Sequence, residues 1–201
     1  MDIQLNFIEQ GQGQPMVLLH GNVENSSYFV HQIAHFSKSY RVIAIDTRGH
    51  GQSPRGEKPF AIKQFAEDLK AFLDARNIAK AVILGFSDGG NIALEFALKY
   101  PERVEKLILN GANLFPSGVK PLYQWPIEVG YRMAKLFSKK SEKAKQNAEM
   151  LGLMVNEPHI DPSELARLTM SVLVVAGTKD MIKESHTMLI YKLNEELIIE
   201  N

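Results

Sequence analysis

The stretch Ala81-Val82-Ile83-Leu84-Gly85-Phe86-Ser87-Asp88-Gly89-Gly90-Asn91-Ile92 decides the fold of this chain. Its first part is a β-branched, apolar run typical of a buried strand, and the residues after Ser87 have the apolar spacing of a helix. Ser87 is therefore predicted to lie on a tight turn from a strand into a helix. Gly85 and Gly89 stand two residues before and after it, where such a turn leaves no room for a side chain.

A serine in this position is predicted to be a nucleophile. The turn strains its backbone and holds its hydroxyl at the carboxyl end of the strand. The first amides of the following helix point toward the serine, so we expect the Asp88 N–H to stabilise an oxyanion. The loop His20-Gly21-Asn22 follows another apolar run, which makes the Asn22 N–H the second expected donor. The alternative is a turn with a purely structural role.

Strand-like runs alternate with helical patterns along most of the chain. This alternation predicts an α/β fold with a mostly parallel, twisted sheet and helices on both faces. We expect strands at residues 4–9, 16–20, 41–46, 81–86, 104–109, 171–176 and 196–200, and helices near 26–37, 62–75, 88–98 and 183–193.

Residues 115–170 interrupt the alternation and contain two stretches with the pattern of a helix. An insertion of this size between core strands is usually functional. We predict a small helical cap over the carboxyl edge of the sheet, with residues 1–114 and 171–201 forming the core. The apolar cap residues are expected mainly to pack the cap onto the core, and a roof over an apolar pocket is the alternative. They are Tyr123, Trp125, Ile127, Tyr131, Met133, Leu136, Phe137, Met150, Leu151 and Met154.

Composition excludes several classes of function. The 201 residues fit one globular domain, and 23 basic residues balance 23 acidic ones, so neither nucleic acid nor a membrane is an expected partner. Between positions 132 and 145 the sequence has six basic residues and only one acidic residue, Glu142. A solvated helix face is the favoured interpretation of this charge, and attraction of an acidic ligand or lipid head group is the alternative. The chain has no cysteine, and the absence of a leader pattern or apolar span predicts a cytoplasmic protein.

No cofactor or metal is expected. Gly11-Gln12-Gly13 lacks the third glycine and the following helix of a dinucleotide loop. His31 and His35 are one helical turn apart but lack the third ligand of a zinc site.

Asp180 is the favoured acid to accompany Ser87. It follows the run at 171–176 through a short loop, which places it at the carboxyl edge of the sheet, where open α/β sheets hold their sites. Asp46 also ends a strand, but its position in a glycine-rich turn favours a turn-fixing role. The strand ending at residue 109 is followed by the amides Asn110 and Asn113 rather than by an acid.

Four stretches together resemble the α/β-hydrolase family, in the order and spacing of its single-domain, esterase-like members. They are HGN (20–22), DTRGHGQS (46–53), GFSDGG (85–90) and VLVVAGTKD (172–180), and the resemblance covers nearly the whole chain. It implies a nucleophile at Ser87, an acid at Asp180, oxyanion amides at Asn22 and Asp88, and a small-molecule acyl substrate.

The resemblance fails at the catalytic histidine. In the family this residue follows the strand after the acid; here that strand is the run at 196–200 and the sequence stops at Asn201, so no residue matches it. We therefore expect a truncated chain whose uncovered sheet edge at 197–199 favours self-association. His186 is the remaining candidate base, but its helix is expected to carry it away from Ser87. His20 and His50 are expected to order their turns, and His159 to be exposed.

Two functions remain open from the sequence. The first is a serine hydrolase of carboxylic esters or related acyl compounds, and the second is a noncatalytic protein of the same fold that binds a ligand or a partner. Other carbonyl or peroxide chemistry is a further possibility within the fold. The sequence does not select a substrate, because the shape of the cap decides it.

Overall fold

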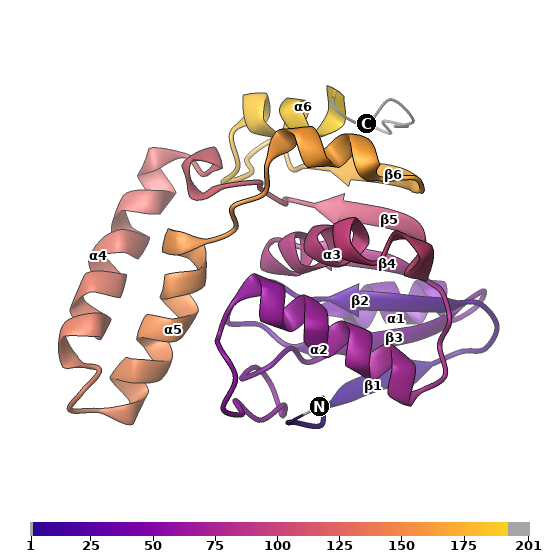
Figure 1. The fold of residues 1–201 in the computed structure, drawn as a ribbon, viewed down its shortest axis with the longest axis horizontal. Helices are drawn as coiled ribbons and strands as arrows, with labels where there is room; N and C mark the ends of the chain where they lie inside the picture. The colour runs from indigo at the N-terminus through magenta and orange to yellow at the C-terminus, as the bar shows by residue number, and fades with distance from the viewer. Residues whose placement is uncertain (1, 193–201) are drawn as a thin grey trace.

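The computed structural model describes residues 2–192, which form one sheet with helices around it (Figure 1). The strand order is β1-β3-β2-β4-β5-β6. All neighbouring strands are parallel except β1, which is antiparallel to β3. The predicted α/β fold with a mostly parallel sheet is confirmed. The strands are β1 (Phe7–Gln10), β2 (Pro15–Leu19), β3 (Arg41–Ile45), β4 (Ala81–Phe86), β5 (Val104–Asn110) and β6 (Ser171–Val175).

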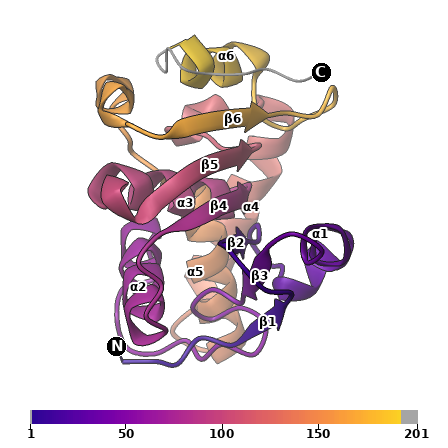
Figure 2. The same ribbon diagram turned by 90° about the vertical axis from the view of Figure 1, so that its right-hand side faces the viewer.

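Helices cover both faces of the sheet, as predicted. Figure 2 shows α1 on one face and α2 on the other, with α3 on the side of α2. Single 3₁₀ turns precede or join several elements, and the helix expected from residue 26 begins as such a turn. The helices of the core are α1 (Val30–Phe36), α2 (Ile62–Ala75), α3 (Asp88–Lys99) and α6 (Glu184–Lys192), and the 3₁₀ turns are η1 (Ser26–Phe29), η2 (Pro101–Arg103), η3 (Pro116–Gly118) and η4 (Pro162–Arg167).

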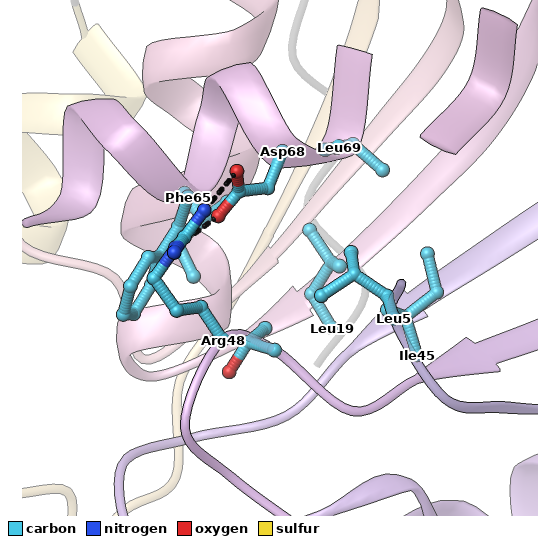
Figure 3. A pocket seen from close by; sticks show the side chains of 9 residues that line it. Leu5, Leu19, Ile45, Arg48, Phe65, Asp68 and Leu69 are labelled. Atoms are coloured by element: carbon cyan, nitrogen blue, oxygen red, sulfur yellow. Dashed lines mark hydrogen bonds and ion pairs between the residues drawn. The ribbon is translucent and has the colours of Figure 1, made fainter. Parts of the chain in front are cut away.

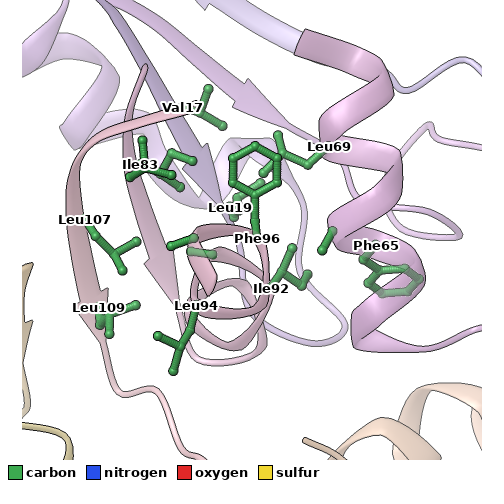
Figure 4. Packing of buried hydrophobic residues seen from close by; sticks show 14 of the residues in the cluster. Val17, Leu19, Phe65, Leu69, Ile83, Ile92, Leu94, Phe96, Leu107 and Leu109 are labelled. Carbon is green, nitrogen blue, oxygen red and sulfur yellow. The ribbon is translucent and has the colours of Figure 1, made fainter. Parts of the chain in front are cut away.

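The two-residue period of β2 divides the core into two layers. Val17 and Leu19 point to the face covered by α2 and α3, while Met16 and Leu18 point to the face covered by α1. Figure 4 shows the larger layer, in which Phe96 of α3 packs beside the β2 residues. Both faces of β2 are buried, which is why its sequence is a continuous apolar run rather than an alternating one.

The segment predicted to form a cap contains a hairpin of two helices, α4 (Pro121–Phe137) and α5 (Glu142–Asn156), that pack against each other. Figure 1 shows it on the side to which the arrowheads of β2 and β5 point, which is the carboxyl edge of the sheet. Leu153 of α5 is buried in the main core. Within the cap, α5 is thus the inner helix and α4 the outer one.

The prediction that most apolar cap residues pack onto the core is wrong for α4. No residue of α4 is buried, and Trp125 and Leu136 are each 70% exposed. The physical reason is that α4 packs against α5, so the apolar residues on its opposite side have no contact with the sheet.

The predicted strand at 196–200, and with it the proposed self-association edge at 197–199, lies outside the described residues. Within residues 2–192, no helix is long and apolar enough to cross a membrane.

Candidate active site

Ser87 lies between β4 and α3 with a strained backbone. Its φ is +53° and its ψ is −121°, a backbone conformation that residues other than glycine rarely adopt. Two sets of hydrogen bonds hold it there: its N–H donates to the Asn110 carbonyl (2.8 Å), and its own carbonyl accepts from Gly90 (2.8 Å) and Asn91 (3.1 Å). Hydrogen bonds from the surrounding backbone therefore hold Ser87 in this conformation.

The glycines around Ser87 are required by close backbone contacts. A Cβ on Gly85 would lie 2.2 Å from the Gly89 carbonyl oxygen, and one on Gly89 would lie 2.0 Å from that of Leu19. Neither position has room for a side chain, as the sequence predicted. The close approach brings the start of α3 directly against the end of β2.

The backbone amides predicted to bind an oxyanion are free. Within the described residues, neither the Asn22 N–H nor the Asp88 N–H donates a hydrogen bond to a protein acceptor. Asp88 is the first residue of α3, so its amide also lies at the positive end of the helix dipole. The Asn22 side chain is occupied elsewhere, because its Nδ2 donates to the Met150 carbonyl of α5 (2.7 Å).

The Asp88 carboxyl group is buried beside Ser87. Burial raises its pKa to about 6, and the neighbouring Asn22 and Asn91 amides oppose this rise only in part. Its Oδ2 atom has no hydrogen-bond partner among the described residues. The sequence indicated a role only for the amide of Asp88, and no local pattern signals the raised pKa of its carboxyl group.

Glu24 is a second acid near Ser87 that the sequence analysis missed. Its Oε2 accepts from the Gly21 N–H (3.1 Å), and both Oε2 and the Ser87 Cβ lie within 3.2 Å of the point that a Cβ on Gly21 would occupy. Burial raises the pKa of Glu24. The carboxylate therefore fixes the loop that carries the Asn22 amide.

Asp180 lies in the loop after β6, at the same edge of the sheet as Ser87. Its Oδ2 is 3.4 Å from the Cβ position of Gly111, the residue that follows Asn110 at the end of β5. Since Asn110 accepts the Ser87 N–H, the end of β5 separates the two predicted catalytic side chains. The Asp180 carboxylate accepts from Ile182 N–H (2.9 Å) and Gly177 N–H (3.3 Å), which orders its loop.

Asp46 holds a turn, consistent with its interpretation from the sequence. Its carboxylate accepts from the Ser26 N–H (2.7 Å), the Gln52 N–H (2.9 Å) and the Asn6 Nδ2 (2.8 Å). Burial alone would raise its pKa, but these hydrogen bonds lower it below its ordinary value.

His20 and His50 lie buried under this turn. His20 Nε2 accepts from the Thr47 N–H (3.0 Å) and its Nδ1 faces the Gly21 carbonyl (2.7 Å), so the Nδ1 carries the proton. Burial lowers the pKa of His20, and it lowers that of His50 to about 4. Both rings are therefore neutral parts of the packing at neutral pH.

His186, the remaining candidate base from the sequence, is occupied. It is buried on α6, its Nε2 accepts the Leu114 N–H (2.9 Å), and its ring packs edge-on against Phe115 (4.5 Å between centroids). Burial lowers its pKa. The three other histidines, His31, His35 and His159, are exposed, and none of the six hydrogen-bonds the Ser87 hydroxyl.

A buried ion pair supports the loop below the site (Figure 3). Arg48 is fully buried and makes paired hydrogen bonds to Asp68 of α2 (2.7 Å each) and to Asp2 (2.8 and 2.9 Å). A cavity of about 10 Å³ beside this pair is large enough for one water molecule. No local pattern identified this pair, because its members are far apart in the sequence.

Open hollows lie between the cap and the core. One, of about 210 Å³, separates α5 from the loop that carries Arg55 and Phe60, and an ion pair between Arg55 and Glu149 (2.7 Å) borders it. A second, of about 340 Å³, extends from Phe60 between α4 and α5. Ser87 lines neither of these two hollows.

Comparison with known proteins shows the family to which the chain belongs. Residues 14–148 match the family model described as the alpha/beta hydrolase fold, and the chain belongs to this family. It is 30% identical over 200 residues to the AB hydrolase superfamily protein YisY of Bacillus subtilis, covering 95% of this chain and 72% of that one.

Two further similarities are to a decarboxylase and an esterase. The chain is 33% identical over 124 residues to a cis-3-alkyl-4-alkyloxetan-2-one decarboxylase of Shewanella oneidensis, a match that covers 59% of this chain and 39% of the relative. The esterase EaEST of Exiguobacterium antarcticum superposes with a TM-score of 0.80 at 21% identity over 98% of this chain and 86% of the esterase, which shows the shared fold.

Proposed function

We propose that this protein is a serine hydrolase that acts on carboxylic esters or related small acyl compounds. The observation that carries the proposal is the backbone of Ser87: a non-glycine residue at φ +53°, held between a strand and a helix N-terminus. Strain of this kind persists where the surrounding structure enforces it, and it is characteristic of a nucleophile that must project above a sheet.

In the proposed reaction, the Ser87 Oγ attacks the acyl carbon and loses its proton to a base. The carbonyl oxygen becomes negative and accepts from the free N–H groups of Asn22 and Asp88, while the alcohol leaves with a proton. Water then attacks the acyl serine, the acid leaves, and Ser87 recovers its proton. Asp180 is assigned to orient the base.

The base itself is not assigned to a residue of this sequence. The rings of His20 and His186 already accept backbone N–H groups, and burial disfavours protonation of His20, His50 and His186. Loss of the histidine from a comparable triad lowers kcat by about 10⁶, and the residual acceleration over water is about 10³–10⁴.

Covalent labelling tests the proposal directly. A fluorophosphonate should add to Ser87, detected by intact mass and peptide mapping, and the S87A variant should stay unlabelled. Ser185→Ala, which removes an exposed serine on α6, is the matched control and should label like the parent. Imidazole in solution should accelerate labelling of the parent but not of S87A. Labelling that is unchanged in S87A, or absent even with imidazole, contradicts the nucleophile assignment.

A noncatalytic binding protein is the second candidate, and the occupied histidines favour it. This function predicts that small apolar esters or acids raise the melting temperature of S87A as much as that of the parent, with no Ser87-dependent turnover. A thermal-shift series on the two variants, followed by product analysis, separates the two functions.

A further inference from the structure

The outer side of the cap carries a continuous apolar surface. Leu122, Trp125, Val129, Met133 and Leu136 follow one another at intervals of three or four residues, which places them along one side of α4. They are 78%, 70%, 41%, 53% and 70% exposed, respectively. We call these five residues the α4 stripe.

The position of α5 explains why the stripe faces outward. α5 is fixed to the core through the buried Leu153, the Glu149–Arg55 ion pair and the Met150 carbonyl, which accepts from Asn22. Figure 1 shows α4 on the side of α5 that faces away from the sheet. Since α4 packs against α5 and the stripe residues are exposed, the stripe lies on the side of α4 away from α5. An apolar patch this continuous on a surface marks an interaction site.

A group of cations adjoins one end of the stripe. Arg132, Lys135, Lys139, Lys140, Lys143 and Lys145 lie on the last turns of α4, the connecting turn and the start of α5, and all six are exposed. Arg132 forms a long ion pair with Glu128 (3.8 Å), and Lys145 forms one with Glu142 (3.5 Å). Within the described residues, Lys139, Lys140 and Lys143 form no ion pair. Lys135 and Lys145 line the hollow between α4 and α5, so the unneutralised charge beside the stripe comes mainly from Lys139, Lys140 and Lys143.

The stripe by itself is too small for a stable interface with a second copy of the chain. A helix of 17 residues is about 26 Å long, and a stripe about 10 Å wide along it covers about 260 Å², against about 800 Å² per partner in a stable interface. Parallel pairing of two stripes would also bring two sets of the same cations close together.

We propose that α4 lies in the surface of a bilayer that contains anionic lipids. The stripe enters the boundary between head groups and acyl chains, where a tryptophan is favoured, and the cations contact lipid phosphates. The helix lies on the membrane and does not cross it, in agreement with the absence of a spanning helix among residues 2–192. This proposal is independent of the chemistry at Ser87.

Trp125 makes the test direct, because it is the only tryptophan in the chain. Its fluorescence should shift to shorter wavelength when vesicles of phosphatidylcholine and phosphatidylglycerol in equal parts are added. Vesicles of phosphatidylcholine alone should give little shift, and added salt should reverse the shift because it screens the lysines. Flotation of the vesicles should carry the protein with them under the same conditions.

Variants separate the two contributions. Lys139→Ala combined with Lys140→Ala should lower the partition coefficient by about 25-fold, and Leu122→Ser combined with Leu136→Ser by at least about tenfold. Val30→Ser combined with Lys38→Ala, which changes exposed residues on and next to α1, is the matched control and should bind like the parent. A shift that depends on protein concentration without vesicles would indicate a second copy and overturn the proposal. Equal binding to both vesicle types, or no shift with either, overturns it as well.

Discussion

The two ends of the candidate site are built differently, although both lie at the carboxyl edge of one sheet. Around β2, β3 and β4, the turns are partly buried and held by several hydrogen bonds, and Ser87 keeps a strained backbone there. Around β6, an edge strand within the described sheet, the loop to Asp180 is largely exposed. At Ser87 the surrounding hydrogen bonds enforce the strain, so Ser87 belongs to the rigid part of the molecule and Asp180 to the adaptable part.

Removal of the buried arginine should show this contrast most strongly. Arg48→Met leaves the Asp68 carboxylate buried without its partner and should lower the free energy of unfolding by about 3–5 kcal/mol. The control is Arg167→Met, which breaks an exposed pair with Glu164 (3.2 Å) and should cost less than about 1 kcal/mol. Urea unfolding followed by circular dichroism measures both; equal effects would contradict the contrast.

A methyl group tests the packing at each end. Gly89→Ala places a Cβ 2.0 Å from the Leu19 carbonyl and should destabilise the protein by about 3 kcal/mol. Gly177→Ala, in the Asp180 loop, meets its nearest atom only at 3.9 Å and should change stability by less than about 0.5 kcal/mol. Thermal denaturation measures both variants. If G177A lowers the melting temperature more than G89A does, the loop after β6 is the more closely packed of the two ends.

The pH dependence of stability should reveal two opposing groups at the rigid end. The pKa of His50 is lowered to about 4, so the contribution of its neutral ring to the free energy of unfolding is lost as pH falls from about 6.5 toward 4. The pKa of Asp88 is raised to about 6, so the contribution of its protonated carboxyl group to the free energy of unfolding grows as pH falls from about 6 toward 4. Asp88→Asn should therefore stabilise the protein by about 3 kcal/mol at pH 7.5 and expose a steeper loss of stability below pH 6. Urea midpoints of parent and variant across this range measure the effect, and parallel curves would show that Asp88 does not titrate as described.

Asp180→Asn should have only a small effect on stability. The amide retains one oxygen that can accept from the Ile182 N–H, so we expect a loss of less than about 1 kcal/mol. Under the proposed function, the same change should slow imidazole-assisted fluorophosphonate labelling of Ser87, because the base loses its orienting carboxylate. A large loss of stability with unchanged labelling would assign Asp180 a purely structural role.

Much of the core could be predicted because its signals are local. The strands and helices around Ser87 are encoded by the period of their apolar residues, and α2 occupies the predicted residues, Ile62–Ala75. The strand expected at 4–9 is shifted to Phe7–Gln10, because its position depends on pairing with β3 rather than on its own pattern. The burial of Arg48 and the raised pKa of Asp88 depend on distant residues and left no local signal.

The sequence by itself determined the turn at Ser87, because a Cβ on Gly85 would meet the backbone of Gly89, four residues further along the chain. Only the tertiary structure decided which groups remain available. It occupies His186 with the Leu114 N–H, and it leaves the apolar side of α4 exposed by placing α5 between that helix and the core. The physical reason is that apolar periodicity specifies that a helix has an apolar side, whereas the partner that covers that side is set by long-range packing.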